Sequence, residues 1–129
     1  MRCIVLAAFV LGVAVAGAAQ SDTLASTRDG VYTEAQARRG KGVFDGVCAE
    51  CHAPVYFSQT FPSWVGAPVS MLFDAIRTSM PEDRPGALTP QQYADVLAYI
   101  FELNGLPPGP RELPPESGRL QRILIQRSP

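Results

Sequence analysis

Cys48-Ala49-Glu50-Cys51-His52 is the stretch of sequence that most constrains the fold. On a helical turn the two cysteines lie on roughly one side, so their sulfurs can reach the same flat ligand. Two thiols at this spacing, followed at once by a histidine, are typical of covalent c-type haem attachment through the two vinyl groups of the porphyrin. The ring of His52 could then supply an axial nitrogen to the iron. We therefore predict a haem site at these residues.

Three other interpretations compete for the same residues. A structural zinc ion needs about four Cys or His ligands, and without its leader the chain offers only Cys48, Cys51 and His52. A thioredoxin-like dithiol expects an adjacent strand and helix, and the neighbouring sequence contains no convincing strand. A simple local disulfide is the third possibility. Of the four interpretations, we prefer haem attachment.

The N-terminal end differs in composition from the rest of the chain. Arg2 supplies a positive charge, residues 3–16 are almost wholly apolar, and small residues follow. This pattern predicts a secretory signal peptide over residues 1–19. Cleavage after Ala18 and after Ala19 both fit, and we prefer Ala19. The apolar run is short for a membrane span, so an uncleaved anchor is the less favoured alternative.

Removal of this leader changes the charge and the cysteine count. The whole chain of 129 residues, enough for one domain, has 11 Lys and Arg, 12 Asp and Glu, and three cysteines. Loss of Arg2 and Cys3 leaves a net charge of −2 and both remaining cysteines in the haem motif. No basic stripe is present, so nucleic-acid binding has no electrostatic basis.

The predicted export agrees with the motif, because bacteria attach haem to such thiols outside the cytoplasm. We expect the mature protein in the periplasm, in a Gram-negative bacterium, with no stable membrane insertion after cleavage of the leader.

A helix is predicted to begin just before the motif. The polar residues 20–32 predict a flexible N-terminus. Thr33 is a suitable N-cap, and Gln36 three residues later predicts a capping box. On a 3.6-residue period one face of this helix carries Gly40, Val43, Phe44, Val47 and Cys51. Because glycine costs about 1 kcal/mol in a helix interior, Gly40 on that face predicts a second backbone crossing closely there.

Two further helices are predicted after the motif. Residues 53–67 lack clear periodicity and suggest an irregular wrap over an apolar object. A helix follows Pro68 and ends before Met80-Pro81, because Pro81 disfavours helical geometry at Met80. Its apolar face consists of Val69, Leu72, Phe73 and Ile76.

The last long helix opens at Thr89-Pro90, with Gln92 closing a capping box, and ends at Asn104-Gly105. Beyond it, residues 110–129 form a C-terminal extension. We expect this extension to pack on the domain through its apolar residues Leu120, Ile123, Leu124 and Ile125.

The pattern Gly40, Phe44, Cys48, Cys51 and His52 resembles the N-terminal helix and haem motif of class I c-type cytochromes, small mono-haem bacterial proteins. The resemblance covers residues 33–109. It implies an all-α fold in which the N- and C-terminal helices cross nearly at right angles over a covalently bound haem. Residues 93–105 resemble the C-terminal helix, with Val96 and Tyr99 at the positions that meet the first helix.

The second axial ligand is sought among the methionines, because His52 is the only histidine. Met71 points away from the apolar face of its helix on a 100°-per-residue count. Met80 precedes a proline in a segment, residues 72–86, that resembles the methionine-ligand loop of small bacterial cytochromes. A flexible core methionine is the alternative, as is an iron without a second protein ligand. We predict Met80 as the ligand.

One departure from the family pattern concerns this loop. His52 and Met80 lie only 28 residues apart, a shorter loop than most members have. The family often uses a proline carbonyl to orient the haem histidine, and Pro54 and Pro62 both remain candidates here.

The resemblance implies an electron carrier and not an enzyme. Cys48 and Cys51 would form the thioethers of one haem c, with His52 and Met80 as axial iron ligands, and a redox donor and acceptor as partners. The main alternative is a dedicated cytochrome subunit of a periplasmic dehydrogenase, such as a quinoprotein. A haem sensor or peroxidase in which Met80 dissociates, and a thiol oxidoreductase using the two cysteines, are less favoured.

Overall fold

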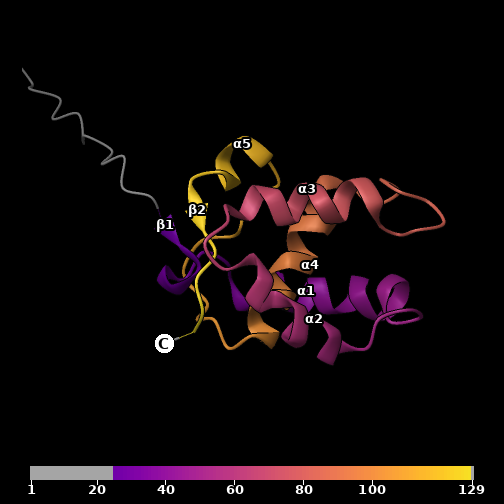
Figure 1. Cartoon of the computed structure of the whole chain (residues 1–129), viewed down its shortest axis with the longest axis horizontal. Helices are drawn as coiled ribbons and strands as arrows, with labels where there is room; N and C mark the ends of the chain where they lie inside the picture. The colour runs from indigo at the N-terminus through magenta and orange to yellow at the C-terminus, as the bar shows by residue number, and fades with distance from the viewer. Residues whose placement is uncertain (1–24, 129) are drawn as a thin grey trace, which may run out of the picture.

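Helix α4 (Pro90–Leu103) is the centre of the structure (Figure 1). The computed structural model describes residues 25–128, so the predicted signal peptide lies outside the described residues. The elements before α4 are β1 (Ala25–Ser26), η1 (Thr27–Asp29), α1 (Glu34–Val43), η2 (Phe44–Cys48), α2 (Pro54–Thr60), η3 (Phe61–Trp64) and α3 (Val69–Ser79). After it come α5 (Ser117–Leu120) and β2 (Ile123–Leu124). The predicted all-α class is confirmed.

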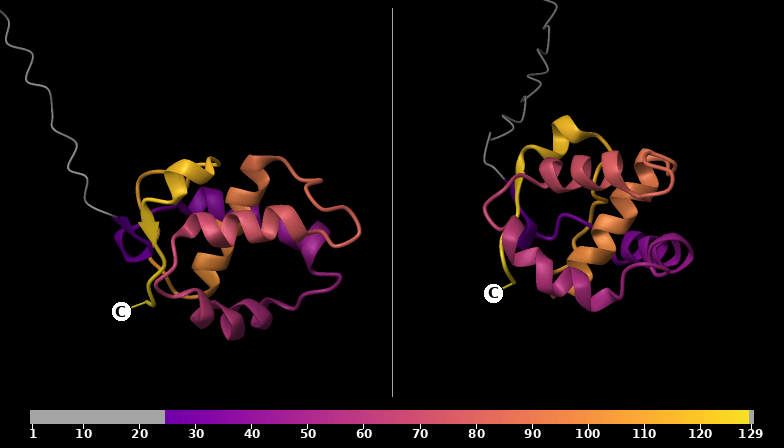
Figure 2. Two further views of the ribbon diagram at one scale, coloured as in Figure 1. Left: turned by 45° about the horizontal axis from the view of Figure 1, so that its top comes forward. Right: turned by 45° about the vertical axis from the view of Figure 1, so that its right-hand side comes forward.

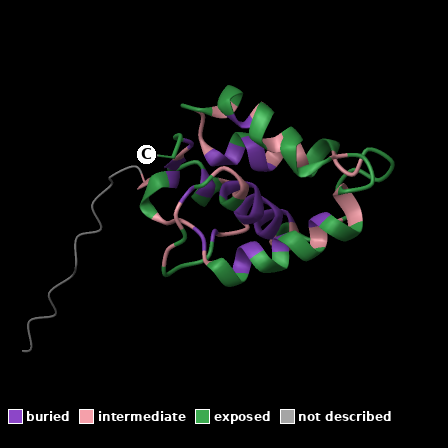
Figure 3. Cartoon of the chain, turned by 90° about the horizontal axis from the view of Figure 1, so that it is seen from below, coloured by how far each residue is buried: buried purple, intermediate pink, exposed green. Residues whose placement is uncertain are grey.

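Every residue of α4 from Tyr93 to Phe101 is buried, because α1, α2 and α3 all pack around it. Figure 3 shows the buried residues gathered along this central helix, while the outer faces of the surrounding helices are exposed. Within residues 25–128 no helix is both long enough and apolar enough to cross a bilayer.

The first helix begins as predicted but without the predicted capping box. The Thr33 hydroxyl accepts the backbone N–H of Gln36 at 3.1 Å. The side chain of Gln36 is instead fully buried and bonded to the backbone of Leu113: its amide donates to the carbonyl (2.9 Å), and its oxygen accepts the N–H (2.7 Å). Buried backbone groups need partners. The Gln36 side chain therefore bonds the buried N–H and carbonyl of Leu113 and is not available to complete the capping box.

The crossing of α1 and α4 is the most extensive contact between described elements. A Cβ atom on Gly40 would lie 1.8 Å from the carbonyl oxygen of Asp95, so only glycine allows the two backbones to approach this closely. One turn further along, the rings of Phe44 and Tyr99 have centroids 5.3 Å apart. The close crossing predicted from Gly40 is confirmed, as is the meeting of this helix with Val96 and Tyr99.

The segment after the motif is more regular than predicted. Residues 54–60 form helix α2, and η3 continues it as a 3₁₀ turn. Pro54 occupies the first helical turn, where a missing N–H costs nothing. The expectation of an irregular wrap was therefore wrong. Helix α2 is short and has no fully buried residue, so its sequence carries no helical periodicity of apolar residues.

The ends of α3 and α4 follow the sequence signals. Met80 caps α3 with extended backbone angles (φ −125°, ψ 149°), as a residue before proline should. Thr89 and Gln92 exchange the two hydrogen bonds of a capping box. Gly105 ends α4 with φ +70°, which glycine adopts without strain.

The two ends of the described chain lie side by side (Figures 1 and 2). Strand β1 pairs in parallel with β2, with Ala25 opposite Ile123. Leu113, Leu120 and Ile125 are fully buried. Residues 25–32 thus pack on the domain, in contrast to the flexible N-terminus predicted for residues 20–32; residues 20–24 lie outside the described part.

Tyr32 anchors the N-terminal segment. Its hydroxyl donates to the carbonyl oxygen of Leu106 at 2.7 Å, and its ring packs against Phe101. Burial, assisted by the negative charges of Glu102 and Glu34, raises the pKa of Tyr32 to about 12. The phenol therefore remains a hydrogen-bond donor at any physiological pH.

Replacing Gly40 by alanine should destabilise the protein by about 2 kcal/mol or more, because the added methyl group overpacks a backbone contact. Urea unfolding followed by circular dichroism measures the effect. Gly42→Ala is the matched control on the same helix: nothing lies within 4 Å of its would-be Cβ. That substitution should leave stability unchanged or raise it by up to about 1 kcal/mol. Equal effects of the two changes would contradict the close crossing.

Candidate functional site

The Cys-x-x-Cys-His motif lies in one tight turn at the end of the first helix. After α1 the helix widens into the π-helical turn η2, which ends with the N–H of Ala49 donating to the carbonyl of Phe44 at 2.9 Å. The carbonyl of Cys48 then accepts both the N–H of Cys51 (3.1 Å) and that of His52 (2.9 Å). Such π turns are frequent at functional sites. The extra residue in this turn changes the 3.6-residue spacing from which the apolar face of the first helix, Gly40 to Cys51, was predicted.

A single cavity of about 770 Å³ brings together the four residues singled out from the sequence. Cys48, Cys51 and His52 line it from the motif turn, and Met80 lines it from the end of α3. The remaining lining is largely apolar and comes from α2, η3, α3, α4 and the loop before α4, including Phe57, Trp64, Leu72, Ile76, Leu88, Val96 and Ile100. The volume lies within the range of about 300–1,000 Å³ typical of ligand sites.

The imidazole of His52 is held by aromatic neighbours on α2. Its ring centroid lies 4.8 Å from that of Tyr56 and 5.7 Å from that of Phe57. Phe57 in turn meets Phe44 edge to face at 5.6 Å. The histidine is thus connected through ring contacts to the crossing of α1 and α4.

Met80 and Met71 have very different surroundings. Met80 follows the last turn of α3, where its N–H donates to the carbonyl of Ile76 at 2.8 Å, and it lines the cavity. Met71 is 57% exposed, which agrees with the expectation that it points away from the apolar face of α3. Of the two methionines, only Met80 lines this cavity.

The two thiols also differ in environment. Cys48 is half-buried, and burial raises the pKa of its thiol. Cys51 is exposed, and neither cysteine forms a disulfide. Within residues 25–128 no three His, Cys, Asp or Glu side chains are grouped to hold a metal ion directly, so the geometry gives no support to the zinc alternative.

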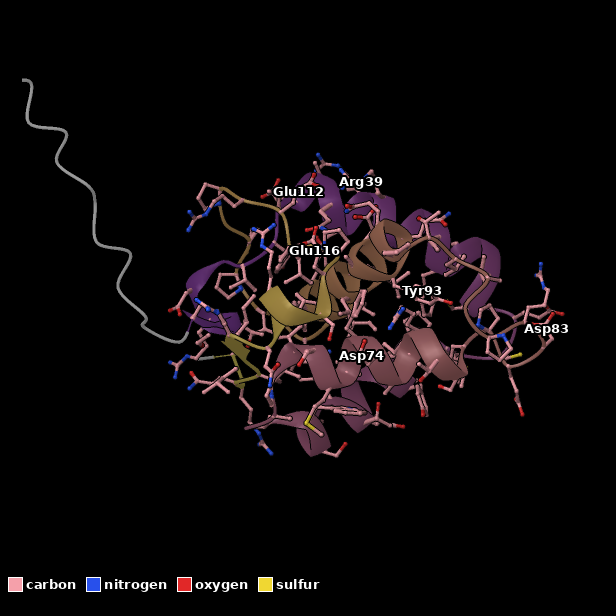
Figure 4. The ribbon with its side chains drawn as sticks, turned by 90° about the horizontal axis from the view of Figure 1, so that it is seen from above. Arg39, Asp74, Asp83, Tyr93, Glu112 and Glu116 are labelled. Atoms are coloured by element: carbon pink, nitrogen blue, oxygen red, sulfur yellow. The ribbon has the colours of Figure 1, made fainter. Side chains whose placement is uncertain are left out.

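Acidic residues contribute to the edge of the cavity. Glu50, Glu82 and Asp83 line it, and the side chain of Arg84 pairs with Asp83 at 3.1 Å. Figure 4 shows Asp83 at the tip of the loop between α3 and α4, far from the core.

The residues around the cavity fit a covalently attached haem. Two free thiols and an imidazole lie on one short turn, a thioether comes from a separate element, and the lining between them is mostly apolar. A covalently attached haem could use this donor set: the two sulfurs for its vinyl groups, and the imidazole and the thioether for its iron.

A family model for cytochrome c oxidase, cbb3-type, subunit III matches residues 35–100, about half of the chain. The chain belongs to this family. The match runs from the start of α1 to near the end of α4 and includes the whole motif and Met80. Comparison with curated proteins and comparison with solved structures each found no match.

Membership identifies a class I c-type cytochrome domain, as the sequence pattern predicted. It implies covalently bound haem c and haem-based electron transfer. A cytochrome domain of this kind is an electron carrier and not an enzyme.

Several contacts that join the elements around the cavity were not identified from the sequence. Arg39 on α1 donates to both carboxylate oxygens of Asp95 at 3.0 Å and to Glu112 at 2.9 Å (Figure 4). The hydroxyl of Tyr93, on α4, donates a hydrogen bond to the backbone carbonyl of Met80. The sequence signal for the Arg39–Asp95 ion pair was Asp95 itself, an acidic residue among the apolar residues of a predicted helix. A buried carboxylate needs a charged or hydrogen-bonding partner.

Thiol titration separates a cytochrome from a thiol oxidoreductase. We expect the exported protein, denatured and reduced, to show no reactive thiol, because thioether-bonded cysteines do not react with thiol reagents. Two reactive thiols in protein from a host competent in cytochrome maturation would contradict haem attachment. Cys51→Ala should reduce the yield of mature protein several-fold, measured as the absorbance of covalently bound haem per mole of polypeptide.

Proposed function

We propose that this protein is a periplasmic mono-haem c-type cytochrome that carries single electrons between redox proteins. The observation that carries the proposal is the common cavity of Cys48, Cys51, His52 and Met80, with its mostly apolar lining. The predicted leader supports an exported protein, and haem attachment to these thiols requires export. The one Cys-x-x-Cys-His motif in the sequence supports a single haem.

Each of the four residues has a distinct role in this proposal. Cys48 and Cys51 would form the thioether bonds, and the tight turn around the Cys48 carbonyl brings them to the same cavity as His52. His52 and Met80, which line the same cavity, would supply the protein ligands of the iron. When bound, the haem supplies reversible one-electron chemistry at its iron.

The surrounding chain favours electron transfer over catalysis. With both His52 and Met80 on the iron, the chain would leave no coordination site for dioxygen or peroxide. A thioether ligand stabilises the ferrous state and raises the reduction potential relative to a second imidazole. Leu72, Ile76, Val96 and Ile100 of α3 and α4 give the cavity an apolar wall, and fixed ligands would keep the geometry of the two oxidation states alike.

Replacing Met80 by alanine tests the proposed ligation. The haem should stay attached, the reduction potential should fall by on the order of 0.1 V, within the range that axial ligands set, and ferrous iron should bind carbon monoxide. Redox titration and optical spectra measure these effects. Met71→Ala is the matched control, because Met71 is exposed on the same helix.

A Met80→Ala protein that retained the near-infrared sulfur–iron band and the potential of the parent would rule out Met80 as the ligand. Carbon monoxide binding by the unmodified protein at neutral pH would instead favour the sensor or peroxidase alternative.

A second candidate role is that of a dedicated cytochrome subunit in a larger enzyme. The family description names an oxidase subunit, and a periplasmic dehydrogenase is the other candidate for a permanent partner. We expect a freely diffusing carrier to elute at its own small size when a native periplasmic extract is fractionated by gel filtration. Co-elution of its haem absorbance with a large oxidase or dehydrogenase would favour the subunit role.

A further inference from the structure

The side chain of Tyr93 contacts the backbone of Met80. Its hydroxyl donates to the carbonyl oxygen of Met80 at 2.7 Å. The two residues belong to different elements: Tyr93 lies in the first turn of α4, and Met80 is the residue at which α3 ends. Figure 4 shows Tyr93 at the junction of these two helices.

Tyr93 is well suited to act as a fixed donor. Its side chain is only 1% exposed, and its ring meets that of Phe73 on α3 nearly at right angles, with centroids 6.5 Å apart. Its own N–H is bonded to the carbonyl of the N-cap residue Thr89. The phenol therefore has little freedom to follow Met80 if that residue moves.

The two backbone polar groups of Met80 are both occupied by rigid elements. Its N–H donates to Ile76 in the last turn of α3, and its carbonyl accepts from Tyr93. Residues 82–87, which follow, are all exposed. The bond from Tyr93 is therefore the last side-chain contact that fixes Met80 before the chain enters a surface loop.

We propose that Tyr93 is a positioning residue that holds the thioether of Met80 toward the iron by fixing the Met80 carbonyl. The inference rests on the proposed function, since it takes Met80 as the axial ligand. Without the hydroxyl, the exposed loop carries Met80 away from the site more often, and competing ligands reach the iron more easily.

Tyr93→Phe removes the hydroxyl and keeps the ring. A net hydrogen bond changes an equilibrium constant by roughly a factor of two to ten. Imidazole should therefore bind ferric Tyr93→Phe about two- to tenfold more tightly than it binds the ferric parent protein. The near-infrared sulfur–iron band should also be lost at a lower imidazole concentration. Optical titration of the intact holoprotein measures both.

Tyr32→Phe is the matched control. The Tyr32 side chain is equally buried and donates a bond of the same length to a backbone carbonyl, that of Leu106, away from the cavity residues. Both variants should lose similar stability in urea, whereas only Tyr93→Phe should change the affinity for imidazole. A merely structural role would move the two variants together.

The outcomes separate the two proposals. If the parent shows the sulfur–iron band and Tyr93→Phe binds imidazole no more tightly than Tyr32→Phe, the positioning role is overturned while the proposed function stands. If the parent lacks the band, Met80 is not the ligand, and both the ligation and this inference fail.

Discussion

The close approach of α1 and α4 at Gly40 and Asp95 is the contact on which the rest of the structure depends. The backbones meet where a side chain on Gly40 could not fit, and beside it Arg39 binds the buried carboxylate of Asp95 with two hydrogen bonds. Helix α1 leads directly into the Cys-x-x-Cys-His motif, and Tyr93 near the start of α4 donates a hydrogen bond to the Met80 carbonyl. The crossing therefore sets the relative positions of two elements from which the proposed haem-binding residues are held.

The cavity proposed to hold the haem borders the hydrophobic core. Leu72, Val96 and Ile100 line the cavity and are also buried core residues. Helix α2 has no buried residue, although it carries several aromatic rings, because Tyr56 and Phe57 face this cavity. An apolar macrocycle in the cavity would remove these surfaces from water, so binding of the cofactor and stability of the domain are physically coupled.

The C-terminal extension is part of the same folding unit, although the family match ends at residue 100. Gln36 holds the backbone of Leu113 with two buried hydrogen bonds, and Arg39 extends the ion pair at the helix crossing to Glu112. The tail then pairs with the N-terminal strand through β2. Both ends of the described chain thus reinforce the face of the crossing opposite the cavity opening, which leaves the motif turn and the methionine loop accessible.

Short-range signals in the sequence were enough to predict α1, α3 and α4 and to indicate a c-type cytochrome, but not α2 or the two short strands. Thr89 and Gln92 mark the start of α4, Pro81 ends α3, and the motif itself predicts the haem, because each depends on neighbours within one or two helical turns. Gly40 even indicated the close crossing, since a glycine on a buried helix face is otherwise costly. What only the tertiary structure decided are contacts between residues far apart in the chain: Gln36 with Leu113 in place of its capping box, Arg39 with Glu112, the ordering of residues 25–32 by β2, and the bond from Tyr93 to the Met80 carbonyl. A side chain's local pattern says which face it occupies, but its partner across the core depends on how the helices pack.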